Sequence, residues 1–189
     1  HHASSAASDV YKRQDKRVLE YFRLESKEEI DLKMWSQVSK RILEPEGSIE
    51  IGIVGKYTGL ADAYKSLNEA LSHGGIFNNV KVKLNWFESE ELNGSNIGKK
   101  LNNCHGILVP GGFGERGAEG KIAAIKYARE NKIPYFGICF GMQLAVIEMA
   151  RNILGIKEAN SSEFADCKES IVGLMTEWSN ETTLLKRDQ

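Results

Sequence analysis

A cysteine between two glycines, Gly137-Ile138-Cys139-Phe140-Gly141, joins two segments of different periodicity. Residues 134–138 form a short apolar run, and residues 144–150 repeat apolar side chains at helical spacing. Gly-x-Cys-x-Gly between a strand and a helix has the layout of a nucleophile elbow, with Cys in place of Ser. The glycines leave room where the sharp turn meets both elements. A lone cysteine is more often a buried structural residue, but this spacing favours Cys139 as a nucleophile.

The expected position of Cys139 at the start of a helix also suits nucleophilic chemistry. Unpaired N–H groups and the dipole at a helix N-terminus favour an anion, and therefore the reactive thiolate. The backbone N–H of Phe140 would then be directed at a developing oxyanion. One such donor contributes roughly 3 kcal/mol in comparable sites.

A second glycine-rich segment, Val-Pro-Gly-Gly-Phe-Gly at 109–114, also follows an apolar run. Because glycine lets main-chain N–H groups approach a reacting atom, we expect Gly111 or Gly112 to provide the second oxyanion donor, opposite Phe140. One alternative is a turn in which glycine is needed only because the backbone adopts a positive φ. A phosphate-binding loop is a weaker alternative, because Gly-x-Gly-x-x-Gly is absent. Lys56 is not a P-loop lysine either, since the Gly-x4-Gly-Lys-Ser/Thr pattern is absent.

A cysteine nucleophile needs a base, usually histidine. His105 begins the third expected strand, about 16 Å from the functional edge at about 3.3 Å per residue. His73 ends a helix that returns from that edge. We therefore expect both to be structural or surface residues, so that these 189 residues supply no base for Cys139.

Composition and charge exclude several classes of protein. The 189 residues are 41% hydrophobic and 27% charged, which is ordinary for a globular protein. A net charge of −1 indicates no nucleic-acid or anionic membrane partner. No apolar run approaches the roughly 18 residues of a membrane span, and no signal peptide is evident. The three cysteines (Cys104, Cys139, Cys167) are an odd number without metal-ligand spacing, which favours a reducing cytoplasm and argues against a disulfide scaffold.

Strand and helix patterns alternate along residues 49–150. Strands are expected at 49–54, 80–87, 105–109 and 134–138. Helices are expected at 61–73, where Gly74-Gly75 would end the helix, and then at 97–102, at 121–131 and after the elbow. Short connections between them predict a doubly wound, mostly parallel α/β sheet. Ligands of such sheets bind beyond the carboxyl ends of the strands, which places Cys139, the 110–117 loop and the 55–60 loop at one edge.

The first 48 residues differ from this pattern. Residues 1–14 are small and polar without periodicity, and we interpret them as a non-native or disordered leader. Residues 15–48 carry apolar positions at helical spacing and end in Glu-Pro-Glu-Gly-Ser, which indicates a helical linker. The main domain is expected at 49–189. No terminating element follows residue 184, so we expect the domain to be incomplete at its C-terminus.

Several motifs together resemble one known family. Gly-Ile-Cys-Phe-Gly-Met-Gln-Leu-Ala at 137–145 and Val-Pro-Gly-Gly-Phe-Gly-Glu-Arg-Gly at 109–117 are similar to the class I (triad) glutamine amidotransferase domain of the CTP synthase family, a flavodoxin-like fold. Further segments that match are 52–57, 62–66, 159–164 (Ala-Asn-Ser-Ser-Glu-Phe) and 175–178. The elbow alone indicates a class I amidotransferase, and the other segments narrow the resemblance, which covers about residues 15–189.

The resemblance implies roles for individual residues. Cys139 would attack the side-chain amide of L-glutamine, and Gly111, Gly112 and Phe140 would form the oxyanion hole. Glu163 would bind the α-amino group of glutamine. Without the resemblance, Glu163 would be interpreted as a solvated charge on a loop. The residues expected to contact glutamine are Gly112, Phe140, Gly141, Met142, Gln143 and Glu163. Phe140 stands where the family often has Leu, which should be tolerated because its N–H is the contributing group.

The family's full enzyme contains more than these residues. The resemblance implies an upstream synthase domain that uses ATP, UTP and Mg²⁺, a mobile lid at 113–120 where GTP acts as activator, and a homo-oligomer. The family's catalytic His and Glu, from a His-Pro-Glu motif, and its arginine for the substrate carboxylate are expected beyond Gln189. We therefore expect a fragment truncated at both ends that needs no cofactor and is inactive alone.

Two other interpretations stay open at this stage. The chain is an amidotransferase domain of a different synthetase or a γ-glutamyl hydrolase, although the 15–48 linker argues against a stand-alone enzyme. Alternatively it is a degenerate, non-catalytic binding or assembly module, against which the intact elbow and glycine loop argue.

Overall fold

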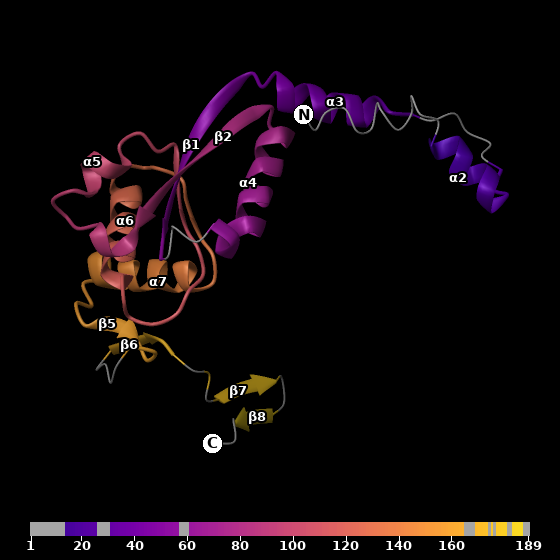
Figure 1. The fold of residues 1–189 in the computed structure, drawn as a ribbon. Helices are drawn as coiled ribbons and strands as arrows, with labels where there is room; N and C mark the ends of the chain where they lie inside the picture. The colour runs from indigo at the N-terminus through magenta and orange to yellow at the C-terminus, as the bar shows by residue number, and fades with distance from the viewer. Residues whose placement is uncertain are drawn as a thin grey trace. The chain divides into compact units, whose positions relative to one another are not determined.

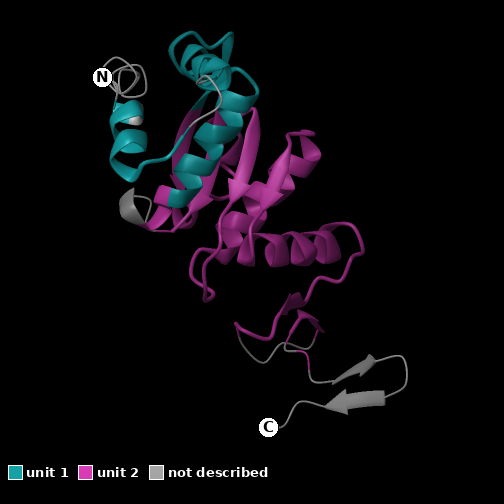
Figure 2. Ribbon diagram, turned by 90° about the vertical axis from the view of Figure 1, so that its right-hand side faces the viewer, with its two compact units in different colours: residues 1–48, 66–82 teal, residues 49–65, 83–189 magenta. Residues whose placement is uncertain are grey.

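The computed structural model describes residues 14–25, 31–56, 61–164, 169–173, 175, 177–180 and 183–186. The chain divides into two compact units, one of residues 1–48 and 66–82 and the other of residues 49–65 and 83–189 (Figure 2). Residues 66–82 therefore cluster with the first unit, although we assigned them to the domain at 49–189. The division into a linker and one domain stays a prediction.

Four strands form a sheet with the order β2-β1-β3-β4, of which β1 and β2 are labelled in Figure 1. They are β1 (Gly47–Gly55), β2 (Val80–Glu88), β3 (Gly106–Val109) and β4 (Tyr135–Gly137). Strand β3 runs parallel to both β1 and β4, and its register aligns Val109 with Gly137. This order is that of the first four strands of a flavodoxin-like sheet. The predicted α/β fold with a mostly parallel sheet is confirmed.

The second unit is built around the buried faces of three helices, α5 (Ile97–Leu101), α6 (Ala118–Glu130) and α7 (Phe140–Asn152). Apolar residues of α6 and α7 pack with β3 into one core, because their three- and four-residue spacing places them on one helix face. The fully or almost fully buried side chains include Leu101, Ile107, Ile125, Leu144 and Ile147. This core holds the carboxyl ends of β3 and β4 next to the start of α7.

The first unit contains α2 (Gln14–Phe22), α3 (Lys33–Leu43) and most of α4 (Lys65–Phe77), which follows the 3₁₀ turn η1 (Ala61–Tyr64). Gln14, which we assigned to the leader, thus begins α2; residues 1–13 lie outside the described part of the chain. The expected end of the helix at Gly74-Gly75 is wrong. A Cβ on Gly75 would lie 2.7 Å from the Val80 carbonyl oxygen, so close packing requires glycine there. The helix ends at Phe77, and Asn79 follows with a φ of 56°.

Short strands follow α7. Strands β5 (Ala159–Ser161) and β6 (Glu169–Val172) pair in parallel, and β7 (Glu177–Asn180) and β8 (Thr183–Lys186) pair antiparallel. None of the four was predicted. A 3₁₀ turn, η2 (Ser89–Glu91), lies between β2 and α5 in the chain. Within the described residues, no helix has the length and apolar character that crossing a membrane requires.

Candidate functional site

Cys139 lies in a strained turn between β4 and α7. Its φ and ψ are 51° and −106°, a left-handed conformation that favours glycine. A Cβ on Gly137 would lie 2.6 Å from the carbonyl carbon of Gly141, and a Cβ on Gly141 would lie 2.1 Å from the carbonyl oxygen of Val109. Neither position has room for a side chain. The Cys139 side chain itself is exposed, so the turn presents the thiol to solvent.

Hydrogen bonds fix the turn from both sides. The N–H of Ile138 donates to Val109 O at 2.9 Å, and the N–H of Gly141 donates to Ile138 O at 2.9 Å. The Tyr135 hydroxyl on β4 donates to Gly141 O at 2.7 Å. Burial raises the pKa of Tyr135, so its hydroxyl stays a protonated donor. Our sequence reasoning missed Tyr135, because nothing in its local sequence indicates a contact with the helix.

The glycine loop after β3 lies against the turn. A Cβ on Gly111 would be 3.6 Å from the Cβ of Cys139. Within the described residues, the N–H groups of Gly111, Gly112 and Phe140 have no hydrogen-bond acceptor. The glycine loop at Gly111 and the start of α7 at Phe140 therefore meet at Cys139, the residue that carries the exposed thiol.

Charged side chains bind both polar groups of the Phe113–Gly114 peptide in this loop, its carbonyl and its N–H. The Lys56 ammonium donates to Phe113 O at 2.8 Å and to Gly114 O at 3.3 Å. The N–H of Gly114 donates to Oε1 of Glu163 at 2.8 Å. Of the 55–60 loop, residues 57–60 lie outside the described part, but Lys56 does reach the glycine loop, as the fold predicted.

A cavity of about 290 Å³ lies between α7 and the β5–β6 segment. Its lining is polar apart from Val172 and comprises Gln143, Ser161, Ser162, Glu163, Val172 and Gly173. Ser161 Oγ accepts the N–H of Glu163 at 3.2 Å and so fixes the backbone that carries the carboxylate. A lone carboxylate in such a cavity suits a ligand that carries an ammonium group. Met142, by contrast, is exposed and is not part of this lining.

The Phe140 side chain also has a defined place in this region. Its ring is buried, packs edge-on against Phe164 at 5.6 Å, and lies 5.0 Å from the ammonium of Lys121. Lys121 is only 1% exposed, and burial together with the nearby positive charge of Lys56 lowers its pKa to about 8. Helical periodicity does not distinguish a buried lysine from a solvated one, so no local pattern indicates that Lys121 is buried.

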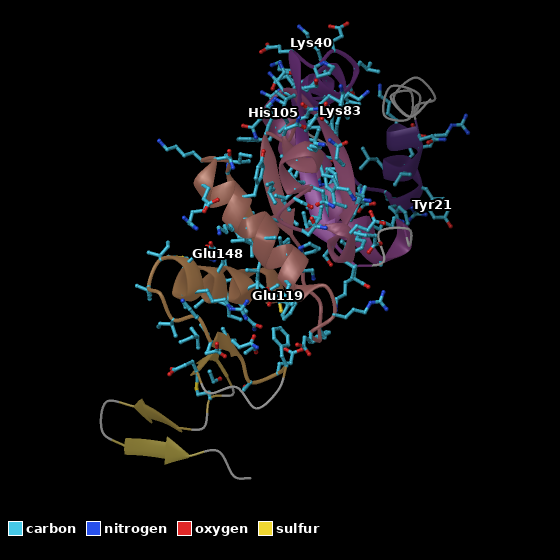
Figure 3. The ribbon with its side chains drawn as sticks, turned by 90° about the vertical axis from the view of Figure 1, so that its left-hand side faces the viewer. Tyr21, Lys40, Lys83, His105, Glu119 and Glu148 are labelled. Carbon is cyan, nitrogen blue, oxygen red and sulfur yellow. The ribbon has the colours of Figure 1, made fainter. Side chains whose placement is uncertain are left out.

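His105 is not placed to serve Cys139. His105 (Figure 3) precedes β3 and accepts the N–H of Glu50 at 3.1 Å, whereas Cys139 lies beyond the carboxyl end of β4. His73 is an exposed residue of α4. The described residues contain no cluster of three His, Cys, Asp or Glu side chains that would hold a metal.

The other cysteines differ from Cys139. Cys104 is buried, and burial together with the charge of Glu50 raises its pKa, which leaves it a poor nucleophile. Its sulfur packs so close to Gly52 that a Cβ there would be 2.8 Å away. Cys167 lies outside the described residues.

Comparison with protein families matches residues 59–181 to "Glutamine amidotransferase class-I". The chain belongs to the class-I glutamine amidotransferase family. The matched amidotransferase segment includes the elbow, the glycine loop and the cavity described above. The resemblance inferred from the motifs is thereby confirmed at the level of the family.

This amidotransferase is 58% identical over 175 residues to the CTP synthase of Bradyrhizobium diazoefficiens, covering 93% of the chain but 32% of that relative. Identity and coverage are the same for the CTP synthase of Rhodopseudomonas palustris strain TIE-1. The chain thus spans about a third of the length of these relatives. A solved structure titled "Trypanosoma brucei CTPS - glutaminase domain with bound acivicin" superposes with a TM-score of 0.64 at 45% identity, covering 67% of this chain and 50% of that one.

Proposed function

We propose that the chain is the larger part of a glutaminase domain of a CTP synthase, and that Cys139 is its nucleophile. The observation that carries this proposal is the exposed thiol on a strained turn, with free N–H groups of the glycine loop beside it. The similarity to CTP synthases and to a glutaminase domain with bound acivicin supports the choice of glutamine as substrate.

The reaction follows from the groups around the thiol. The Cys139 thiolate attacks the side-chain amide carbon of L-glutamine, and the carbonyl oxygen becomes an oxyanion. The N–H groups of Phe140 and of Gly111 or Gly112 stabilise that oxyanion. The C–N bond then breaks, the nitrogen takes up a proton and leaves as ammonia, and a γ-glutamyl thioester remains. Water hydrolyses the thioester to glutamate and regenerates the thiol.

Substrate recognition is proposed for the cavity beside the elbow. Glu163 would bind the α-ammonium of glutamine with a charge-assisted hydrogen bond. Gln143, which also lines the cavity, would contact the substrate from α7, while Gly141 and Met142 keep the geometry of the first helical turn. We assign neither His73 nor His105 as the acid or base for proton transfer.

In the full enzyme, the ammonia would serve a synthase domain that converts UTP to CTP with ATP and Mg²⁺, with GTP as activator and in a homo-oligomer. Among the described residues, no three His, Cys, Asp or Glu side chains cluster so as to hold a metal ion. The cytoplasmic location expected from the cysteines also stays a prediction.

A chimera tests the proposal. Residues 15–189 of this chain would replace the matching segment of the Bradyrhizobium diazoefficiens relative, and CTP formation would be measured with glutamine and with ammonia as nitrogen source. We expect both sources to support CTP formation, and Cys139→Ala to abolish only the glutamine-dependent reaction. A Cys139→Ala chimera that still uses glutamine would contradict the proposal, and a chimera active only with ammonia would favour the degenerate module.

A further inference from the structure

One peptide group of the glycine loop lies between a buried cation and a carboxylate. The carbonyl of Phe113 accepts from Lys56 at 2.8 Å, and the N–H of the same peptide, that of Gly114, donates to Glu163 at 2.8 Å. The hydrogen bonds to Lys56 and Glu163 polarise this peptide in the same direction, so each strengthens the other. Lys56 and Glu163 are 107 residues apart in the sequence. The ion pairs among the described residues do not include a pair between these two side chains.

Lys56 is itself firmly placed. It is 9% exposed, and the Tyr64 hydroxyl donates to its carbonyl oxygen at 2.6 Å. The Tyr64 ring packs against Trp86 with centroids 4.8 Å apart. A Cβ on the preceding residue, Gly55, would lie 3.0 Å from the same hydroxyl, so the backbone here is closely packed. A rigid main chain delivers the ammonium to a fixed point, which makes it suited to orient a loop.

The held peptide lies close to the proposed oxyanion donors in the chain, with the Gly112–Phe113 peptide between them. Fixing the plane of the Phe113–Gly114 peptide restricts the rotations that direct the N–H groups of Gly111 and Gly112 toward Cys139. Phe113 is 82% exposed, so its side chain does not hold the loop in place. Lys56 and Glu163 are therefore the charged groups that hydrogen-bond this peptide, while the Lys121 ammonium lies 3.5 Å from where a Cβ on Gly112 would be.

We propose that Lys56 is a positioning residue for the glutaminase reaction, acting with Glu163 through the Phe113–Gly114 peptide to set the oxyanion hole. Glu163 has two oxygens. Oε1 accepts from Gly114, and Oε2 is available to the substrate ammonium in the cavity. One side chain thus links the binding of the amino group to the geometry of the oxyanion donors. This inference rests on the proposed glutaminase function.

Saturation kinetics of Cys139 alkylation test the proposal on this chain. The probe is a chloromethyl ketone analogue of glutamine, whose ketone oxygen becomes an oxyanion when the thiolate attacks. The limiting rate, kinact, reports the oxyanion hole, and the half-saturating concentration, KI, reports binding. Iodoacetamide, which forms no oxyanion, reports the thiol alone.

We expect Lys56→Met to lower kinact by about tenfold or more, while KI and the iodoacetamide rate stay within about twofold. Lys56→Arg, which retains a cationic donor, should recover part of kinact. Glu163→Gln should raise KI and also lower kinact, and the double variant should be non-additive in kinact because both act on one peptide. Lys100→Met, which removes a surface lysine paired with Glu91, is the control and should change neither constant.

A folded Lys56→Met variant with unchanged kinact would overturn the inference. So would loss of folding in both Lys56 variants, measured by circular dichroism, because Lys56 would then have only a structural role. Failure of the proposed function is distinguishable. In that case the unsubstituted chain would show no saturation and no protection by L-glutamine, and both proposals would fall.

Discussion

Gly141 packs directly on the backbone of Val109, so that a Cβ on Gly141 would lie 2.1 Å from the Val109 carbonyl oxygen. This contact joins the end of β3 to the first turn of α7. It places the glycine loop, which starts one residue after Val109, next to Cys139. The elbow and the loop therefore depend on one close approach that only glycine allows.

Substituting Gly141 should damage the elbow specifically. Gly141→Ala should destabilise the protein by about 2–3 kcal/mol, because the new methyl overlaps backbone that cannot move without shifting the sheet. Gly98→Ala on α5 is the matched control. Its Cβ would meet only Tyr127 at 3.7 Å, an ordinary contact, so we expect no loss of stability. Urea denaturation would measure both, and equal stability of the two variants would contradict the packing described here.

The strain at Cys139 has a measurable consequence. Glycine tolerates a φ of 51°, whereas any residue with a Cβ is strained there. Cys139→Gly should therefore be more stable than Cys139→Ala by about 1–2 kcal/mol. At most positions the order is the reverse, and the alanine variant is more stable than the glycine variant. Thermal unfolding of the two variants provides the comparison. A more stable alanine variant would mean that the turn is relaxed.

The buried lysine on α6 predicts a pH dependence of stability. The pKa of Lys121 falls from 10.5 to about 8 on folding, so between these values the unfolded chain binds more protons than the folded one. Stability attributable to Lys121 therefore rises with pH from about 8 to about 10.5. We expect Lys121→Met to be more stable than the unsubstituted chain at pH 7, by about 1–2 kcal/mol, with a smaller advantage at pH 10.

Unfolding of both proteins in urea across this pH range would test the prediction. A constant difference between them would show that the Lys121 ammonium keeps its ordinary pKa. The methionine retains most of the aliphatic stem, so the comparison isolates the charge and its contact with the Phe140 ring.

An ion pair between the exposed Arg129 and the buried Glu148 joins α6 to α7. The Glu148 side chain is completely buried, and Arg129 binds it through Nε and Nη2 at 2.8–3.1 Å (Figure 3). Arg129→Met leaves that buried carboxylate without its cation and should destabilise the protein. Adding Glu148→Leu should recover most of this loss. If the single and double variants are equally unstable, the arginine contributes through packing and not through the pair.

The sequence predicted the parts of the site that depend on local geometry. The elbow and the glycine loop were found because a tight turn demands glycine at fixed offsets from Cys139. The order of strands and helices up to α7 followed from periodicity. The roles assigned to the site residues remain predictions, although the structure does bring Cys139 and Gly111 together and places Glu163 against Gly114.

The remaining features depend on contacts between distant segments. Lys56, Tyr135 and Lys121 acquire their surroundings only when the sheet assembles, so no local pattern marks them. Gly75 was misread as the end of a helix because its small size serves packing against Val80 and Val82, and not a turn. Strands β5 to β8 have only three or four residues each, too few for alternation to be recognised.

Peptide mapping of the chain after reaction with the chloromethyl ketone analogue of glutamine tests the central claim most directly. The expected result is modification of Cys139 ahead of Cys104 and Cys167, slowed by L-glutamine but not by D-glutamine. Modification of Cys139 at the rate of the other thiols, or without protection by L-glutamine, would contradict the assignment of this elbow as a glutaminase nucleophile.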